Sequence, residues 1–278
     1  MIAADSAHQA NRSAEVTEEF QIPLAAAETY ETVFVPALFA QWAPVLCQAA
    51  AVAAGDRVLD VACGTGVVAR AAAGIVGEGN VVGVDLNQAM LTVARRVAPQ
   101  ITWRQGEANA LPAADASFDV VVCQMALMFF PDQPGAVREM ARVTKPGGRV
   151  AVLVPSVLDA QDAYRPFVDM AVGHAGPEAR NLLSAYFSCG QPEHLEGLFT
   201  AAGLDVTLIR PHRGAARFPS IDALVATEVT STPLGERISE GTYAQIRDGA
   251  QRVLAPFTTP DGHLEAPFES QIIIGHHR

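Results

Sequence analysis

A glycine-rich turn marks the N-terminal half of the chain. Gly64 and Gly66 follow an apolar run at 57–62 that is typical of a strand, and they precede a pattern typical of a helix. Glycine has no Cβ, so the backbone can turn sharply at these positions and a ligand can approach it closely. The following helix directs unpaired N–H groups toward whatever lies over the turn. The pattern predicts a ligand site at the carboxyl end of this strand.

Three carboxylates accompany the turn. Asp60 precedes Gly64 by four residues, Asp85 closes the second apolar run, and Glu107 follows the third. A carboxylate at Asp85 can hold ribose hydroxyls, and one at Glu107 can accept a hydrogen bond from an adenine amino group. Asp60 would repel a nearby pyrophosphate, whereas it would favour a zwitterionic amino-acid group or a sulfonium cation.

A nicotinamide dinucleotide is an alternative ligand for the same turn. Residues 64–69 match the G-x-G-x-x-A fingerprint of dinucleotide sites, and Asp85 lies 19 residues after Gly66. A nicotinamide-dependent oxidoreductase therefore stays open as an alternative function. The chain does exclude a Tyr-x-x-x-Lys pair, because Lys145 is the only lysine and Ala141 stands four residues before it.

The segments that must position these residues alternate between strands and helices. Asn87 is a good N-cap for one helix, and Pro99 follows its end. This alternation predicts an α/β fold with a doubly wound, mostly parallel sheet. We expect strands at 57–62, 80–86, 101–105, 118–123 and 149–154, helices at 67–75, 88–97 and 132–143, and a turn at 145–148.

The alternation ends after Pro155. We expect two further strands at 204–210 and 269–274, with helices at 159–173, 178–187, 192–202 and 220–255. The predicted organisation is a flexible N-terminal segment (1–29), a ligand-binding core with an N-terminal lid helix (30–155), a helical cap insertion (156–203), and the last two strands with a second helical insertion at about 216–262 (204–278).

Aromatic residues recur at helical spacing just ahead of the glycine turn, and Pro36 suits the first turn of a helix there. Such a stripe can belong to the core, or it can form a lid over the ligand. The stripe consists of Tyr30, Phe34, Leu38, Phe39 and Trp42.

Composition and charge limit the classes of partner. A net charge of −11 argues against a nucleic-acid groove, which needs a basic surface. No signal peptide and no membrane span is apparent, and four widely spaced cysteines without a C-x-x-C motif indicate reduced thiols. We therefore expect a cytoplasmic protein with no metal site, which is either a monomer or a homodimer.

Five segments of the chain, taken in order, resemble the successive motifs of class I S-adenosylmethionine-dependent methyltransferases. They come in that family's order and at its spacings, and the resemblance covers residues 30–155. It is strongest to the branch that includes the ubiquinone and menaquinone biosynthesis methyltransferases and many small-molecule methyltransferases. The segments are VLDVACGTG (58–66), VD (84–85), QGEANALP (105–112), FDVVVCQM (118–125) and EMARVTKPGGRV (139–150).

The resemblance implies a Rossmann-like sheet of seven strands whose last strand is antiparallel. It also implies S-adenosylmethionine as the cofactor. Ala62, Gly64 and Gly66 would lie against the methionine part of the cofactor, with Asp60 near its ammonium group. Thr65 is a further candidate in the same turn.

The other cofactor contacts implied by the resemblance follow the second, third and fourth strands. Asp85 would take both ribose hydroxyls, and Leu86 would pack on the adenine. The edge of the adenine would lie between Glu107 and Ala108, although the family more often has Asp at the first of these positions. The remaining candidates are Gln124 and Met125, facing the methionine and methyl groups, and Tyr30, closing over the cofactor.

The acceptor is expected to be a small, apolar or aromatic molecule. Candidate acceptor contacts are Met128 and Phe129 after the fourth strand and Tyr164 and Tyr186 in the first helical insertion, with His174 as a candidate base. Methyl transfer is an in-line displacement that depends mainly on positioning and desolvation. Oxygen is the first choice for the methylated atom, followed by nitrogen and carbon. A protein that binds S-adenosylmethionine without catalysis is a further alternative.

Overall fold

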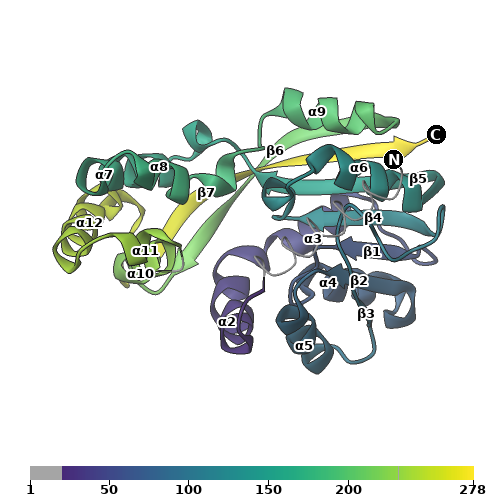
Figure 1. The fold of residues 1–278 in the computed structure, drawn as a ribbon, viewed down its shortest axis with the longest axis horizontal. Helices are drawn as coiled ribbons and strands as arrows, with labels where there is room; N and C mark the ends of the chain where they lie inside the picture. The colour runs from purple at the N-terminus through teal and green to yellow at the C-terminus, as the bar shows by residue number, and fades with distance from the viewer. Residues whose placement is uncertain (1–20, 231) are drawn as a thin grey trace, which may run out of the picture.

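The computed structural model describes residues 21–230 and 232–278, which form a seven-stranded sheet with helices on both faces (Figure 1). The strand order is β3-β2-β1-β4-β5-β7-β6. The first five strands pair in parallel, and β7 is antiparallel to both of its neighbours. The strands are β1 (Val58–Val61), β2 (Val81–Asp85), β3 (Thr102–Gln105), β4 (Phe118–Gln124), β5 (Thr144–Pro155), β6 (Leu204–Phe218) and β7 (Leu264–His277).

The predicted fold is confirmed, including the antiparallel last strand. The helices agree with the predicted ones in the first half of the chain, and Asn87 caps α5 by accepting from the N–H groups of Ala89 and Met90. The helices of the core are α3 (Trp42–Ala49), α4 (Val67–Val76), α5 (Gln88–Val97), α6 (Gln133–Val143) and α9 (Pro192–Ala201).

Strand β4 lies at the centre of the sheet and is buried on both faces. Val120 and Val122 pack into one apolar cluster with α3 and α4, whereas Val121 and Cys123 pack into a second cluster with α6. Successive side chains of a strand point to opposite faces, so a continuous apolar run suits a strand with helices on both sides. This packing fixes the carboxyl edge of the sheet, where the predicted site residues lie.

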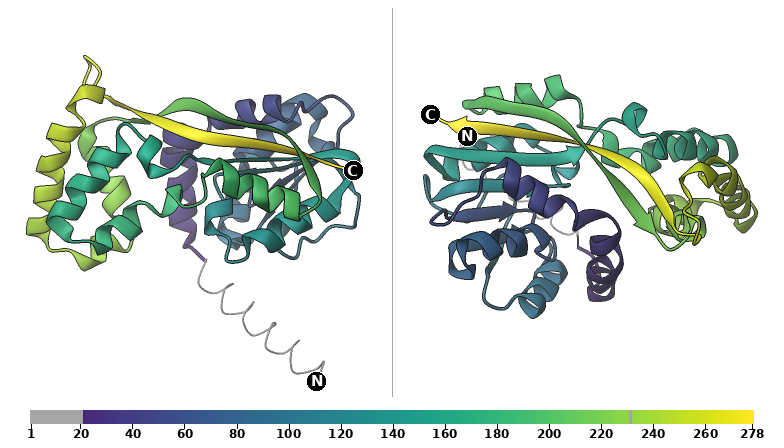
Figure 2. Two further views of the ribbon diagram at one scale, coloured as in Figure 1. Left: turned by 90° about the horizontal axis from the view of Figure 1, so that it is seen from above. Right: turned by 180° about the vertical axis from the view of Figure 1, so that it is seen from behind.

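Strands β6 and β7 form a long ribbon that extends beyond the rest of the sheet (Figure 2). The predicted strands at 204–210 and 269–274 are too short, because residues 204–218 and 264–277 are paired along nearly their whole length. The second helical insertion lies between these strands, close to the predicted bounds of about 216–262. Directly opposite ion pairs, Arg213–Glu269 and Arg217–Glu265, stabilise the extension. Because these residues are polar, the extended part of each strand lacks the apolar run from which a strand is predicted.

A cap of helices lies at one end of the molecule (Figure 1). Three of its helices connect the two ribbon strands, and the other two precede β6 in the chain. Helix α7 packs on α8 and α12, and α10 packs on α11 and α12. The single helical stretch predicted at 220–255 is three helices, since Ser239 begins a new helix by accepting from the N–H of Thr242. The cap helices are α7 (Tyr164–Ala175), α8 (Glu178–Leu183), α10 (Ile221–Thr230), α11 (Leu234–Arg237) and α12 (Glu240–Val253).

The N-terminal lid helix begins earlier than predicted. Helix α2 (Leu24–Thr29) continues directly into a π-helix, η1 (Tyr30–Phe39), so Pro36 lies inside a helix and not in its first turn. A π-helix has i→i+5 hydrogen bonds, in place of the i→i+4 bonds of an α-helix. Of the flexible segment predicted at 1–29, residues 1–20 lie outside the described residues, and 24–29 are helical.

Two ion pairs hold this N-terminal helix against the core. Glu28 pairs with Arg96 of α5 at 2.8 Å, and Glu31 pairs with Arg70 of α4 at 2.9 Å. Across residues 21–230 and 232–278, no single helix is long and apolar enough to cross a membrane; only the pair 24–39 and 42–49, bent by 62°, reaches the required length and composition together.

Gly66 is needed for packing inside the core. It begins α4 with a φ of +88°, and a Cβ at this position would lie 2.2 Å from Cη2 of Trp103 on β3. Trp103 is buried and donates its indole N–H to the carbonyl of Ala98. The absence of a side chain at Gly66 therefore makes room for a tryptophan; its predicted contact with the cofactor stays a prediction.

We expect Gly66→Ala to destabilise the protein by about 1–3 kcal/mol, because the added methyl group overpacks Trp103 and the left-handed backbone disfavours a side chain. Gly74→Ala in the same helix is the matched control, since nothing lies within 4 Å of its Cβ position. The control should gain about 0.5–1 kcal/mol. Urea unfolding of both variants measures the difference, and equal stabilities would contradict the packing argument.

Candidate functional site

Asp85 ties the glycine turn to the end of the neighbouring strand. One carboxylate oxygen accepts from the N–H of Gly64 at 2.7 Å, and the other accepts from the N–H of Asn87 at 2.8 Å. Burial raises the pKa of Asp85, and the two N–H donors oppose this effect. Asp85 and Gly64 therefore face a common place at the carboxyl edge of the sheet.

Asp60 is a buried carboxyl group inside the same edge. It is 1% exposed and accepts from the N–H of Ala69 at 2.9 Å. Burial raises its pKa to about 8, an effect that the Ala69 N–H partly offsets and that the charge of Asp85 increases. A carboxyl group in this setting would be stabilised in its charged form by a cationic ligand group.

Tyr30 lies over the turn. The Cβ position of Gly64 is 3.6 Å from Cε1 of Tyr30, and the ring stacks on Phe34 and Phe39 of the same π-helix. Burial raises the pKa of Tyr30, and the charges of Asp85 and Asp60 raise it further. Its hydroxyl oxygen lies 3.7 Å from the Cβ position of Gly64. The N-terminal helix thus covers the face of the turn that the sequence assigned to a ligand.

Two residues at this edge have a strained backbone. Ala62 and Met125, directly after β1 and β4, both have a φ of +55°. Non-glycine residues rarely adopt this left-handed conformation, and such strain concentrates at functional sites. The two strands thus end in backbone turns that lie side by side in the sheet order.

The remaining cofactor candidates also lie at this edge. Thr65 Oγ1 and Gln124 Oε1 are buried polar atoms with no hydrogen-bond partner among the described residues, while Gln124 donates to the carbonyl of Phe39 at 3.1 Å. The carbonyl of Leu86 accepts from Gln105 at 3.1 Å. Unsatisfied buried polar atoms are uncommon and indicate a place for a further partner. Glu107 and Ala108 lie after β3, partly buried.

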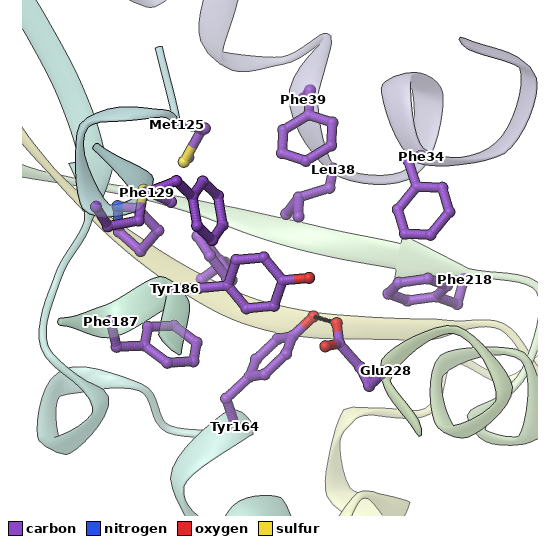
Figure 3. Close-up of a pocket in the computed structure, with 13 residues that line it drawn as sticks. Phe34, Leu38, Phe39, Met125, Phe129, Tyr164, Tyr186, Phe187, Phe218 and Glu228 are labelled. Atoms are coloured by element: carbon purple, nitrogen blue, oxygen red, sulfur yellow. Dashed lines mark hydrogen bonds between the residues drawn. The ribbon is translucent and has the colours of Figure 1, made fainter. Parts of the chain in front are cut away.

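A largely apolar cavity lies next to this edge, beneath the N-terminal helix and the cap (Figure 3). The four predicted acceptor contacts, Met128, Phe129, Tyr164 and Tyr186, all line it. We call it the aromatic cavity. Its lining residues are Phe34, Leu38, Phe39, Met125, Met128, Phe129, Pro155, Tyr164, Tyr186, Phe187, Phe218, Glu228 and Phe268.

Glu228 is the one lining residue with a carboxyl group. It lies on α10, is 7% exposed, and accepts from the hydroxyl of Tyr164 at 3.0 Å. Burial raises its pKa to about 7, and the Tyr164 hydrogen bond partly offsets this rise. Burial also raises the pKa values of Tyr164 and Tyr186, and the charge of Glu228 adds to the effect.

Glu228 is not among the site residues predicted from the sequence, although the sequence pattern around it marks it as unusual. Ile221, Leu224, Val225 and Val229 form the buried stripe of α10, and Glu228 stands on that stripe at helical spacing. An acidic residue on an apolar helix face is unusual and marks a candidate site. The aromatic residues contributed by β6 and β7 could not be found in this way, since their strands were predicted too short.

The proposed base His174 is misplaced. It is exposed on the last turn of α7, and it does not line the aromatic cavity. Its neighbouring glycines suggested a loop in the cap, but the residues form a helix whose buried face carries Tyr164, Phe167 and Val168. His174 follows Phe167 by two turns, but it lies in the exposed last turn of the helix and outside the cavity lining. We therefore discard this role.

The chain matches the family model described as a methyltransferase domain over residues 59–152. It is 32% identical over 198 residues to the ubiquinone/menaquinone biosynthesis C-methyltransferase UbiE of Edwardsiella ictaluri, a match that covers 62% of this chain and 79% of that protein. The chain belongs to the class I S-adenosylmethionine-dependent methyltransferase family. Its five sequence segments are therefore motifs of this family.

Other similarities reach less far. The chain is 38% identical over 133 residues to the 2-phytyl-1,4-naphtoquinone methyltransferase of Synechococcus elongatus, covering 45% of this chain but only 54% of that protein. The chain thus spans about half the length of this relative. The solved structure of the YcgJ protein of Bacillus subtilis has the same fold, with a TM-score of 0.57, 21% identity, and coverage of 86% of this chain and 98% of that chain.

The raised pKa of Asp60 predicts a pH-dependent stability. The unfolded carboxyl loses its proton near its ordinary value of 3.8, whereas the folded one keeps it to about pH 8. The stability that Asp60 contributes is therefore complete below about pH 4 and is lost as the pH rises to about 8. Asp60→Asn removes this loss, so the variant should gain stability relative to the wild type with rising pH, by up to about 1.4 kcal/mol per pH unit.

Urea unfolding at several pH values, without ligand, measures this difference between variant and wild type. Titrating groups that do not interact with Asp60 cancel in the comparison, because they are common to both proteins. A difference that stays constant from pH 4 to pH 8 would contradict the raised pKa.

Proposed function

We propose that this protein transfers the methyl group of S-adenosylmethionine to a small aromatic acceptor of the quinol or phenol kind, bound in the aromatic cavity. The observation that carries the proposal is the position of Met125. It follows β4 at the carboxyl edge, beside the turn after β1, and its side chain lines the cavity. A cofactor held at that edge and an acceptor held in the cavity would meet at Met125.

The residues at the edge fit the cofactor in their chemistry. Asp60 is a buried carboxyl without a strong cationic partner, which suits the ammonium group of the methionine part. Thr65 and Gln124 offer unsatisfied buried oxygens. Asp85 would hold the ribose hydroxyls, and Ala62 with Gly64 would border the methionine part. Leu86, Glu107 and Ala108 would surround the adenine.

Through Tyr30, the N-terminal helix would cover the bound cofactor. Its ring lies against Gly64, so cofactor binding requires the ring to move aside and then to pack over the bound molecule. The helix would thus act as a lid that keeps water out. Exclusion of water and alignment of the acceptor are the main contributions that a protein makes to methyl transfer.

The cofactor, when bound, supplies an activated methyl group with a good leaving group. The acceptor ring would lie between aromatic side chains of the N-terminal helix, the cap and the β6–β7 ribbon. Such rings favour flat partners in offset or edge contacts. The quinone-related names of the two curated relatives support an acceptor of this class.

Binding of S-adenosylhomocysteine tests the cofactor. At about 100 times its Kd, it should stabilise the protein by about 2.7 kcal/mol, and NAD should have no effect. The antiparallel β7 between β5 and β6 also differs from the sheet order of dinucleotide-binding proteins. Stabilisation by NAD alone would favour the oxidoreductase alternative and refute the proposal.

Asp85→Ala should abolish binding of S-adenosylhomocysteine, because it removes the ribose contact and releases Gly64. Asp162→Ala, an exposed acid in the cap, is the matched control and should bind normally. Calorimetric titration of proteins shown to be folded by circular dichroism measures both. Turnover of S-adenosylmethionine with a panel of phenols and hydroquinones then separates an enzyme from a non-catalytic binding protein.

A further inference from the structure

The aromatic cavity places one ionisable acid in an apolar setting. Ten of its thirteen lining residues are apolar, and the other three are Glu228, Tyr164 and Tyr186. A buried carboxyl group is costly unless it is paired or neutral. Within the described part of the chain, no arginine, lysine or histidine forms an ion pair with Glu228. Packing alone therefore gives no reason for an acid at this position.

Tyr164 fixes the position of the carboxyl group without neutralising it. Its hydroxyl donates to one oxygen of Glu228 at 3.0 Å, and its ring packs edge-on against Phe187 and Phe268. Tyr186 also faces the group, and its ring packs edge-on against Phe129. Two tyrosines, one on the cap helix α7 and one on the short turn after α8, thus surround a carboxylate that can accept one further proton donor.

Glu228 and Met125 lie on opposite sides of the cavity (Figure 3). An acceptor ring between them would present one substituent to Glu228 and a different atom to the methyl group near Met125. The cavity has a volume of about 50 Å³, counted as the space open to the centres of water molecules. A single water needs roughly 10–15 Å³ by the same measure. The closed cavity therefore suits a single flat ring, and a larger acceptor requires the lid to open.

A ring hydroxyl is the substituent that suits this carboxyl group best. It donates a hydrogen bond as Tyr164 does, and it brings no charge into the apolar cavity. An ammonium group would also pair with a carboxylate among aromatic rings. However, its methylated product would keep the charge that Glu228 holds, which opposes product release, whereas a methylated phenol or quinol stays neutral.

We propose that Glu228 is a catalytic residue that binds and deprotonates a ring hydroxyl of the acceptor, with Tyr164 as its positioning residue, and that a ring carbon on the other side accepts the methyl group. This inference rests on the proposed function. A carbon acceptor differs from the oxygen expected from the sequence, because the hydroxyl held by Glu228 faces away from Met125.

The step balances in atoms and charge. The hydroxyl proton moves to Glu228 as a ring carbon attacks the methyl group; a carbon–carbon bond forms, and the bond between sulfur and methyl breaks to leave a neutral thioether. The ring carbon then loses its own proton to water, and Glu228 returns its proton to the ring oxygen. One proton is released overall, and the carboxylate is regenerated. A base with a pKa of about 7 is suited to this exchange near neutral pH.

Binding of two small probes tests the contact with the hydroxyl. 4-Methylphenol carries a hydroxyl that stays neutral near pH 7, and 4-methylanisole replaces it by a methyl ether. We expect Glu228→Gln to weaken 4-methylphenol binding at least tenfold and to leave 4-methylanisole unchanged. Glu236→Gln, an exposed acid of the same cap, should alter neither. Equal weakening of both probes, or no weakening of 4-methylphenol, would overturn the inference, as would tighter Glu228-dependent binding of benzylamine.

Turnover tests the catalytic role. With 1,4-dihydroxybenzene kept reduced, we expect methylation on a ring carbon. We also expect a kcat/KM that rises with pH through about 7 as Glu228 ionises; among the described residues, Tyr164 and Tyr186 are the titratable groups that face it. Glu228→Gln should lower kcat about 100-fold or more and abolish this limb of the pH profile, and Tyr164→Phe should shift the limb. A methyl ether as the wild-type product would overturn the placement of the hydroxyl.

Failure of the inference and failure of the proposed function give different results. If the wild type binds S-adenosylhomocysteine and methylates the acceptor, while Glu228→Gln does so with the same pH profile, then only the role of Glu228 is wrong. If the wild type does not bind S-adenosylhomocysteine, the proposed function is wrong, and the inference falls with it.

Discussion

The hydrogen bond from the Gly64 N–H to the carboxylate of Asp85 holds the candidate site together. It joins the turn after β1 to the end of β2, and the second oxygen of Asp85 fixes the start of α5 through Asn87. Because both oxygens already accept backbone N–H groups, the carboxylate is held rigidly at the edge of the sheet. The strained turns at Ala62 and Met125 and the buried Asp60 depend on the same arrangement of strand ends.

The second constraint is the length of the β6–β7 ribbon. The two strands are the last two of the sheet, extend beyond it, and carry the cap helices α10, α11 and α12, while α7 and α8 pack beside these helices (Figure 2). Phe218 and Phe268 of the ribbon, Phe39 of the N-terminal helix, and Tyr164 and Tyr186 of the cap segment thereby share one cavity. No local segment could form this cavity, because its walls come from segments that lie far apart in the chain.

Two buried carboxyl groups, Asp60 and Glu228, have raised pKa values because burial outweighs the hydrogen bonds that each accepts. One lies at the edge proposed for the cofactor, and the other lies in the cavity proposed for the acceptor. Buried acids without a cationic partner lower stability, and proteins keep them mainly where a ligand or a reaction uses the charge. Their positions on either side of Met125 support two adjoining half-sites.

The sequence alone predicted the sheet, the glycine turn and the edge where Asp60, Asp85 and Met125 lie, because apolar runs and their following polar residues reflect local geometry. It also selected Met128, Phe129, Tyr164 and Tyr186, which the structure brings to one cavity. It could not reveal that Gly66 accommodates Trp103, that His174 faces solvent, or that Glu228 faces the aromatic rings. These outcomes depend on contacts between residues far apart in the chain, which only the packing of the ribbon, the cap and the N-terminal helix decides.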